Sequence, residues 1–147
     1  MHNVIIIMGH GNYATGLKSS IELITGIVDN VYAIDFVEND SDITLKHKIK
    51  EIFDKHPKSS ILIVCDIVGG TPFKVAAEFV INSDKDVVLI GGCNLSGILE
   101  IILQKDNVSI NRLAELAVET TKNTVLHFEK SKVQKSSNER SKTTEGI

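Results

Sequence analysis

Short β-branched apolar runs alternate along the chain with longer segments in which apolar residues recur at helical spacing. Continuous runs rich in Val and Ile are typical of strands that are buried on both faces of a parallel sheet. Four such strands are predicted, at Val4–Met8, Val31–Asp35, Ser60–Cys65 and Val87–Ile90.

Five helices are predicted after these strands, because their apolar residues recur every three or four positions. The first covers Tyr13–Thr25 with Gly26 as its C-terminal cap, and Ser109 caps the fifth. Thr71 and Pro72 suit the N-cap and the first position of the third. The residues expected on the buried faces are Ala14, Leu17, Ile21 and Ile24; Leu45, Ile49, Ile52 and Phe53; Val75, Ala76, Phe79 and Val80; Leu95, Leu99, Ile102 and Leu103; and Leu113, Leu116 and Ala117.

This alternation predicts an α/β fold, an open doubly wound and mainly parallel sheet with strand order 2-1-3-4. One more short strand is predicted over Thr124–Glu129, where apolar and polar residues alternate. Because no helix follows it, we expect it to lie antiparallel at a sheet edge. An isolated edge strand needs a neighbour, so we expect two chains to exchange it in a homodimer.

Length and composition narrow the class of protein. The 147 residues suit one domain, expected over residues 1–130, followed by a flexible polar tail over residues 131–147. A net charge of −3, without basic stretches interleaved with aromatics, argues against a nucleic-acid partner. No apolar run is long enough for a membrane span or a signal peptide, so we expect a cytoplasmic protein. Cys65 and Cys93 are expected to be reduced and buried.

The candidate chemistry gathers where the first and third strands end. His10 follows the first strand between Gly9 and Gly11, and Asp66 follows the third. With strand order 2-1-3-4, both residues lie at the point where the strand order reverses, which is where open α/β sheets bind ligands. Asp66 can accept a hydrogen bond from one ring nitrogen of His10 and leave the other as a nucleophile.

Glycines, which carry no side chain beyond the backbone, lie close in sequence to both of these residues. Gly11, Gly69 and Gly70 allow amides to approach phosphoryl oxygens closely, and Thr71 adds a hydroxyl at the start of a helix. Residues 91–94 are expected to form a wall of the same crevice. We therefore predict phosphoryl chemistry on His10 without a metal or cofactor, since no metal-ligand spacing is present.

Plainer interpretations compete with this one. A lone histidine in a turn is often structural, and an aspartate before Gly-Gly is often an ordinary turn residue. The segment from Gly9 to Ala14 also fits the glycine-rich turn of a small dinucleotide-binding domain, with Asp35 as its ribose-binding acid. That alternative needs more strands than the chain offers, and it leaves Asp66 unexplained.

The chain resembles the enzyme IIA (EIIA) domain of the mannose family of the bacterial phosphoenolpyruvate-dependent sugar phosphotransferase system (PTS). The resemblance runs from about Met1 to about Lys130. The matching residues are Gly9-His10-Gly11, Ile34-Asp35-Phe36, Asp66 with Gly69-Gly70-Thr71-Pro72-Phe73, and Gly92-Cys93-Asn94-Leu95.

The resemblance implies that Nε2 of His10 accepts a phosphoryl group from the carrier protein HPr, with Asp66 on Nδ1. His10 would then pass the group to a IIB component, which serves a IIC/IID membrane permease. It also implies a homodimer that exchanges its C-terminal strands. Mannose, fructose, sorbose, amino sugars and gluconate-type acids all stay open as substrates. A regulatory module that signals through its phosphorylation state stays open as an alternative function.

An apolar rim around His10 is expected to receive these partners in a small, transient interface. The candidates are Phe36, Phe73 and Leu95, whereas Ile98 fits the core better. Two positions depart from the family's pattern, Ile67-Val68 after the aspartate and Ser96-Gly97 after the Asn-Leu step. Both flank the expected pocket and bear on which partner and which sugar are served.

Overall fold

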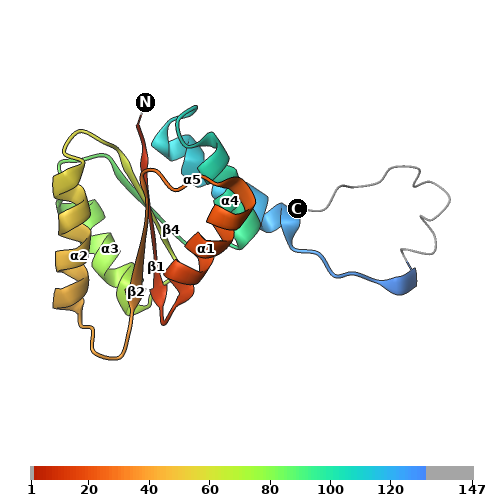
Figure 1. The fold of residues 1–147 in the computed structure, drawn as a ribbon, viewed down its shortest axis with the longest axis horizontal. Helices are drawn as coiled ribbons and strands as arrows, with labels where there is room; N and C mark the ends of the chain where they lie inside the picture. The colour runs from red at the N-terminus through yellow and green to blue at the C-terminus, as the bar shows by residue number, and fades with distance from the viewer. Residues whose placement is uncertain (1, 132–147) are drawn as a thin grey trace.

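The computed structural model describes residues 2–131, which form a parallel sheet between two layers of helices (Figure 1). Strands and helices alternate along the chain before a final pair of helices. The elements are β1 (Val4–His10), α1 (Tyr13–Thr25), β2 (Val31–Phe36), α2 (Asp42–Lys55), β3 (Ile61–Cys65), α3 (Thr71–Asn82), β4 (Val87–Gly91), α4 (Leu95–Gln104) and α5 (Ile110–Thr124).

The four strands pair in the order β2-β1-β3-β4, and all three pairings are parallel. This confirms the predicted architecture and strand order. The strand bounds differ from the predicted ones by one or two residues. β1 continues past Met8, and its last residue, His10, pairs with Phe36 of β2. The histidine therefore stands on the end of a strand, which fixes its backbone more firmly than a turn would.

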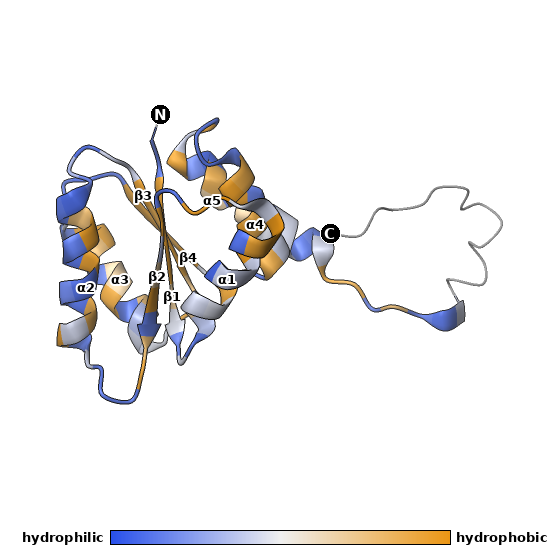
Figure 2. Ribbon diagram, in the orientation of Figure 1, coloured by the Kyte–Doolittle hydropathy of each residue, from blue (hydrophilic) through white to orange (hydrophobic). Residues whose placement is uncertain are grey.

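Each face of the sheet packs against its own layer of helices. Ile5, Ile7 and the alternate residues of β3 face α1, α4 and α5. Val4, Ile6 and Met8 face α2 and α3 on the other side. Figure 2 shows the apolar sides of both helix layers turned toward the strands. β1 and β3 are buried on both sides, as continuous Val and Ile runs predict.

Most of the helical residues predicted to face inward are buried or half-buried, but two are not. Ile24 is 39% exposed and Leu103 is 54% exposed, while Ile98 and Ile101 are completely buried. The apolar residues of α4 cover more than half of its circumference, opposite Ser96, Glu100 and Gln104, so their periodicity does not show which part of that arc faces the sheet.

Helix caps agree with prediction at two of three positions. Gly26 ends α1 in the left-handed conformation, and the side chain of Ser109 caps α5. At α3 the N-cap is Gly70, and Thr71 is already the first helical residue, so the predicted cap is wrong by one position. The extended backbone of Gly70 turns the chain into the helix without a side-chain hydrogen bond.

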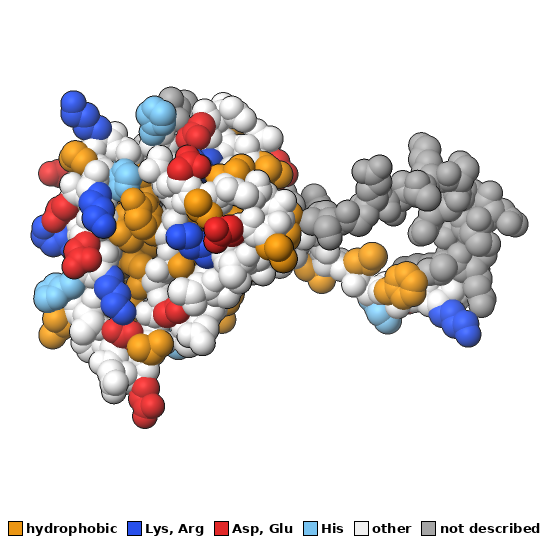
Figure 3. Space-filling view, viewed as in Figure 1, with side chains coloured by type: hydrophobic (Ala, Val, Ile, Leu, Met, Phe, Trp, Pro, Cys, Tyr) orange, Lys and Arg blue, Asp and Glu red, His pale blue; other side chains and the backbone are white. Residues whose placement is uncertain are grey.

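The strand predicted over Thr124–Glu129 is wrong for this single chain. α5 continues to Thr124, and residues 125–129 pair with no strand in the described part of the molecule. They run away from the body, and Val125, Leu126 and Phe128 are 75%, 82% and 72% exposed (Figures 1 and 3). An edge strand forms only against a neighbouring strand, and in one chain this segment leaves the body without pairing with the open edge of β4. Residues 132–147 of the expected tail lie outside the described residues.

Candidate functional site

The structure brings His10 and Asp66 together at the carboxyl edge of the sheet. β1 lies next to β3, with Met8 opposite Cys65, so the residues that follow these two positions meet. The backbone N–H of Asp66 donates to the carbonyl of Met8 at 3.1 Å and extends this pairing by one residue. The histidine and the aspartate therefore share the point where the strand order reverses.

Three hydrogen bonds hold the carboxylate of Asp66. Its Oδ2 lies 2.7 Å from Nδ1 of His10 and also accepts the backbone N–H of His10 at 2.9 Å. Its Oδ1 accepts the N–H of Ile67 at 2.9 Å. Because a carboxylate only accepts, Nδ1 carries the proton of the neutral ring, and the lone pair is on Nε2.

The charge of Asp66 is maintained by its partners. Its side chain is only 14% exposed, and this burial works to raise its pKa. The hydrogen bonds from the backbone and ring of His10 and from the N–H of Ile67 outweigh burial, so the pKa of Asp66 lies below its usual range. Asp66 is therefore a charged acceptor at neutral pH, beside a His10 side chain that is 46% exposed.

Two neighbours shape the remaining sides of the His10 ring. The edge of one ring meets the face of the other between His10 and Phe36, with centroids 5.7 Å apart. A Cβ on Gly70 would come 2.9 Å from Cε1 of His10, so only glycine fits there without moving the ring. Gly69, with φ of +87°, makes the left-handed turn that brings Gly70 to this place.

The turn before α3 leaves amides available for an anion. Among residues 2–131, no acceptor is found for the N–H groups of Gly69, Gly70 and Thr71. The positive end of α3 lies at the same point. Gly11 differs, because its N–H donates to the carbonyl of Phe36 at 2.8 Å. Gly11 therefore closes its turn instead of presenting the free amide that the sequence suggested.

Asp35 has a structural partner that the dinucleotide alternative did not foresee. Its Oδ1 accepts the N–H of Thr15 at 3.1 Å, and its Oδ2 accepts the hydroxyl of Thr15 at 2.7 Å. Both oxygens thus bind the first turn of α1. In the dinucleotide alternative this carboxylate would bind a ribose, but hydrogen bonds within the protein already occupy both of its oxygens.

The wall predicted at residues 91–94 consists largely of structural contacts. Asn94 caps α4 through the N–H of Gly97, and its amide donates to the hydroxyl of Thr124 in α5. The hydroxyl of Tyr13 lies 3.5 Å from the carbonyl of Cys93. Burial, followed by the nearby charge of Asp66, raises the pKa of Tyr13 to about 12. Tyr13 also packs against Gly9, where a Cβ would collide with its ring.

The apolar surface beside the site differs from the rim expected from the sequence. Phe36, Phe73 and Leu95 are all half-buried, and each packs partly against the core. Ile98 is entirely buried, as its core interpretation predicts. The open apolar side chains are instead Ile67 and Val68, at 54% and 68% exposed. The sequence did carry a signal for this open apolar surface, because Ile67 and Val68 directly follow Asp66 at the end of a strand.

Both cysteines are free and buried, as predicted, and neither competes with His10 as a nucleophile. Burial, with the charge of Asp66 second, raises the pKa of Cys65 to about 12, so the thiol stays protonated. Within residues 2–131, no group of three or more His, Cys, Asp or Glu side chains is placed to hold a metal ion. No helix in this same part of the chain is long and apolar enough to cross a bilayer.

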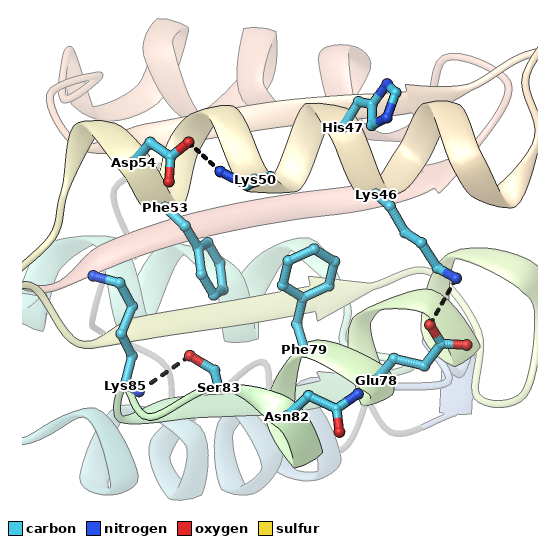
Figure 4. Close-up of a pocket in the computed structure, with 10 residues that line it drawn as sticks. All are labelled: Lys46, His47, Lys50, Phe53, Asp54, Glu78, Phe79, Asn82, Ser83 and Lys85. Carbon is cyan, nitrogen blue, oxygen red and sulfur yellow. Dashed lines mark hydrogen bonds and ion pairs between the residues drawn. The ribbon is translucent and has the colours of Figure 1, made fainter.

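A separate groove of about 450 Å³ lies between α2 and α3 (Figure 4). Phe53 and Phe79 meet edge to face in it, and the Lys46–Glu78 ion pair spans the two helices. None of the residues that surround His10 lines this groove. It therefore forms no part of the site at the carboxyl edge of the sheet.

Comparison with known proteins agrees with this arrangement. Residues 4–118 match the family model described as PTS system fructose IIA component. The chain is 33% identical over 109 residues to the sorbose-specific EIIA component of Lacticaseibacillus casei, which covers 74% of this chain and 78% of that protein. It is also 33% identical over 113 residues to the fructose-specific EIIA component of Bacillus subtilis, covering 74% and 75%.

A longer relative and a solved structure extend the comparison. The mannose-specific EIIAB component of Escherichia coli is 32% identical over 133 residues, which cover 89% of this chain but 41% of that protein. The crystal structure of an EIIA component from Streptococcus agalactiae superimposes with a TM-score of 0.79 at 28% identity, covering 85% of this chain and 96% of that one. The chain therefore belongs to the EIIA family of the phosphotransferase system, in its mannose, fructose and sorbose branch.

Proposed function

We propose that this EIIA component carries a phosphoryl group on Nε2 of His10. It accepts the group from phosphorylated HPr in the cytoplasm and passes it to a IIB component, which serves a IIC/IID permease for a sugar or sugar acid. The observation that carries the proposal is the bond of 2.7 Å between Nδ1 of His10 and Asp66, which leaves the nucleophilic lone pair on the half-exposed side of the ring.

The transfer exchanges one phosphorus–nitrogen bond for another. The lone pair on Nε2 of His10 attacks the phosphorus, and the bond to the donor histidine breaks as its electron pair returns to the donor ring. Positive charge develops on the imidazole of His10, and the carboxylate of Asp66 on Nδ1 stabilises it. The free amides of Gly69, Gly70 and Thr71 are suited to the equatorial phosphoryl oxygens. Passing the group on to IIB reverses these events.

The docking surface in this proposal is small and apolar. Exposed Ile67 and Val68 adjoin the His10 site, and half-buried Phe36, Phe73 and Leu95 extend the rim. A carrier must release each partner after transfer, which favours a small interface without a deep pocket. Ile67 and Val68 would contact the partner protein, while the hydrogen-bonded pair of His10 and Asp66 lies behind them.

We further propose a homodimer that exchanges the segment after α5. β4 is the last strand of the sheet, so its outer edge is unpaired in one chain. A groove of about 410 Å³ runs along this edge and is lined by Val88, Leu89, Ile90, Ala114, Glu115, Val118 and Glu119. Val125, Leu126 and Phe128 are exposed in the segment that leaves α5. Pairing this segment with the partner's β4 would bury both surfaces.

Phosphorylation by the general PTS proteins tests the central proposal. Incubation with phosphoenolpyruvate, enzyme I and HPr should label the protein on one histidine, with a bond that survives alkali and is lost in acid. His10→Ala should abolish the label. His47→Ala is the matched control, since this exposed residue of α2 lines the separate groove between α2 and α3, and the variant should be labelled normally. Labelling of the His10→Ala variant would refute the proposal.

A further inference from the structure

The first turn of α1 is capped by a residue from another element. Asn12 occupies the N-cap position of α1 but makes no side-chain hydrogen bond to the helix. The carboxylate of Asp35, near the end of β2, accepts both the N–H and the hydroxyl of Thr15 instead. A long-range contact thus replaces the local cap that most helices use.

The next residue of β2 holds the turn that joins His10 to this helix. The carbonyl of Phe36 accepts the N–H of Gly11 at 2.8 Å, and the ring of Phe36 meets the ring of His10 edge to face. Asp35 and Phe36 together fasten both ends of the short connection between β1 and α1. His10 is therefore held by Asp66 on the β3 side and by this β2 contact on the other.

The hydrogen bonds of Asp35 also distinguish the N-terminus of α1 from that of α3. A carboxylate at the N-terminus of α1 satisfies the positive end of that helix. The N-terminus of α3 has no such carboxylate cap, and the free amides of Gly70 and Thr71 begin it. A phosphoryl group on His10 is thus directed toward α3.

We propose that Asp35 is a positioning residue for phosphoryl transfer, acting through its two hydrogen bonds to Thr15 on the backbone that carries His10. This inference rests on the proposed function of His10. Asp35 itself touches neither donor nor acceptor in this scheme. Asp35 contributes by orienting the imidazole of His10. Reaction rates depend steeply on this placement, since a shift of about 1 Å lowers the rate on the order of 100-fold.

Four variants test the proposal in transfer from phosphorylated HPr at saturating donor. Asp35→Ala should lower the rate constant about tenfold or more. Asp35→Asn keeps an oxygen that accepts from Thr15 and should restore most of the rate. Thr15→Val removes the hydroxyl donor without changing the size of the side chain and should be slowed as well. Ser109→Ala is the control, because it removes the cap of α5 far from His10 and should transfer normally.

Nitrogen NMR of the His10 ring gives a readout that needs no partner protein. The unphosphorylated wild-type protein should show one neutral tautomer, protonated on Nδ1, and Ser109→Ala should show the same. Asp35→Ala should give a mixture of tautomers. A wild-type ring signal and rate in Asp35→Ala would overturn the proposal, as would an Asp35→Asn variant as slow as Asp35→Ala. Labelling of His10→Ala would refute the proposed function instead, while leaving this spectroscopic test valid.

Discussion

At the scale of single residues, Asp66 contributes hydrogen bonds and charge, and substitution separates the two. Asn at this position keeps one oxygen for the backbone N–H of His10 or of Ile67 but loses the charge that stabilises a cationic ring. Asp66→Asn should therefore stay folded and slow transfer from HPr about 100-fold or more, as neutralising a histidine's aspartate partner does in hydrolases. Rapid-quench kinetics measures the rate, and an unchanged rate would reduce Asp66 to a turn residue.

The lowered pKa of Asp66 predicts how stability depends on pH. Its pKa in the folded protein lies below the unfolded value of about 3.9, so its contribution is complete above that value and is lost as pH falls through the folded pKa. The free energy of unfolding of the wild type should exceed that of Asp66→Asn at pH 7. Urea titrations at decreasing pH should show this difference shrinking below about pH 4. A constant difference would contradict the assignment.

Gly70 is the residue where space is most limited around the ring. Its φ of −72° suits any amino acid, so Gly70→Ala should fold, but the new methyl group would press on Cε1 of His10. We expect transfer to slow about tenfold because the ring must move. Gly16→Ala is the control, since a Cβ there meets no neighbouring atom and stabilises a helix by about 1 kcal/mol. Equal rates for the two variants would show that the ring tolerates the displacement.

How much of the site could be predicted differs from residue to residue. His10 and Asp66 were identifiable because both follow inner strands, and strand order alone makes such positions meet. The partners of Asp35 and of the N–H of Gly11 were not identifiable. Each depends on how β2 ends beside α1 in space, and no spacing in the sequence encodes that contact.

At the scale of elements, the strands were predicted within two residues because buried parallel strands are continuous apolar runs. The inner face of α4 was harder to predict, since its apolar residues cover more than half of its circumference and do not show which part of that arc faces the sheet. The segment after α5 was misassigned for another reason. Its alternating pattern suits a strand, but in a single chain the segment leaves the body and pairs with no strand in the described residues.

This segment yields a prediction about assembly. A chain that ends at Thr124 keeps all of α5, including the hydroxyl that accepts from Asn94, and should fold. It should be monomeric, or aggregate through the bare edge of β4, whereas a chain that ends at Ser131 should remain a dimer. Light scattering coupled to size exclusion gives the mass of each. A well-folded dimer from the shorter chain would rule out strand exchange.

A point substitution tests whether the dimer depends on this segment in particular or on exposed apolar residues in general. Leu126→Asp should produce monomers, because burying an unpaired carboxylate at the exchanged edge is costly. Leu23→Asp is the matched control, since Leu23 is 88% exposed on α1 and lies outside the groove beside β4. It should leave the dimer intact.

At the scale of the whole molecule, the layered sheet separates the regions with different tasks. The His10 site stands at the carboxyl edge of the inner strands, and the groove proposed for the partner's segment runs along β4. The groove between α2 and α3 belongs to the opposite helix layer (Figure 4). Substitutions in one region are therefore expected to act independently of the others.

The half-exposed ring of His10 has a consequence for what the phosphorylated protein reports about its surroundings. Neither HPr nor IIB needs a lid to open before it reaches Nε2, and the proposed transfer exchanges one phosphorus–nitrogen bond for another of similar energy. The reaction then runs backward as readily as forward. The phosphorylated fraction would track the ratio of charged donor to empty acceptor, as the protonated fraction of a buffer tracks pH. This fraction would rise whenever uptake stalls, and it would report the supply of phosphorylated HPr relative to the amount of IIB that is free to accept the group.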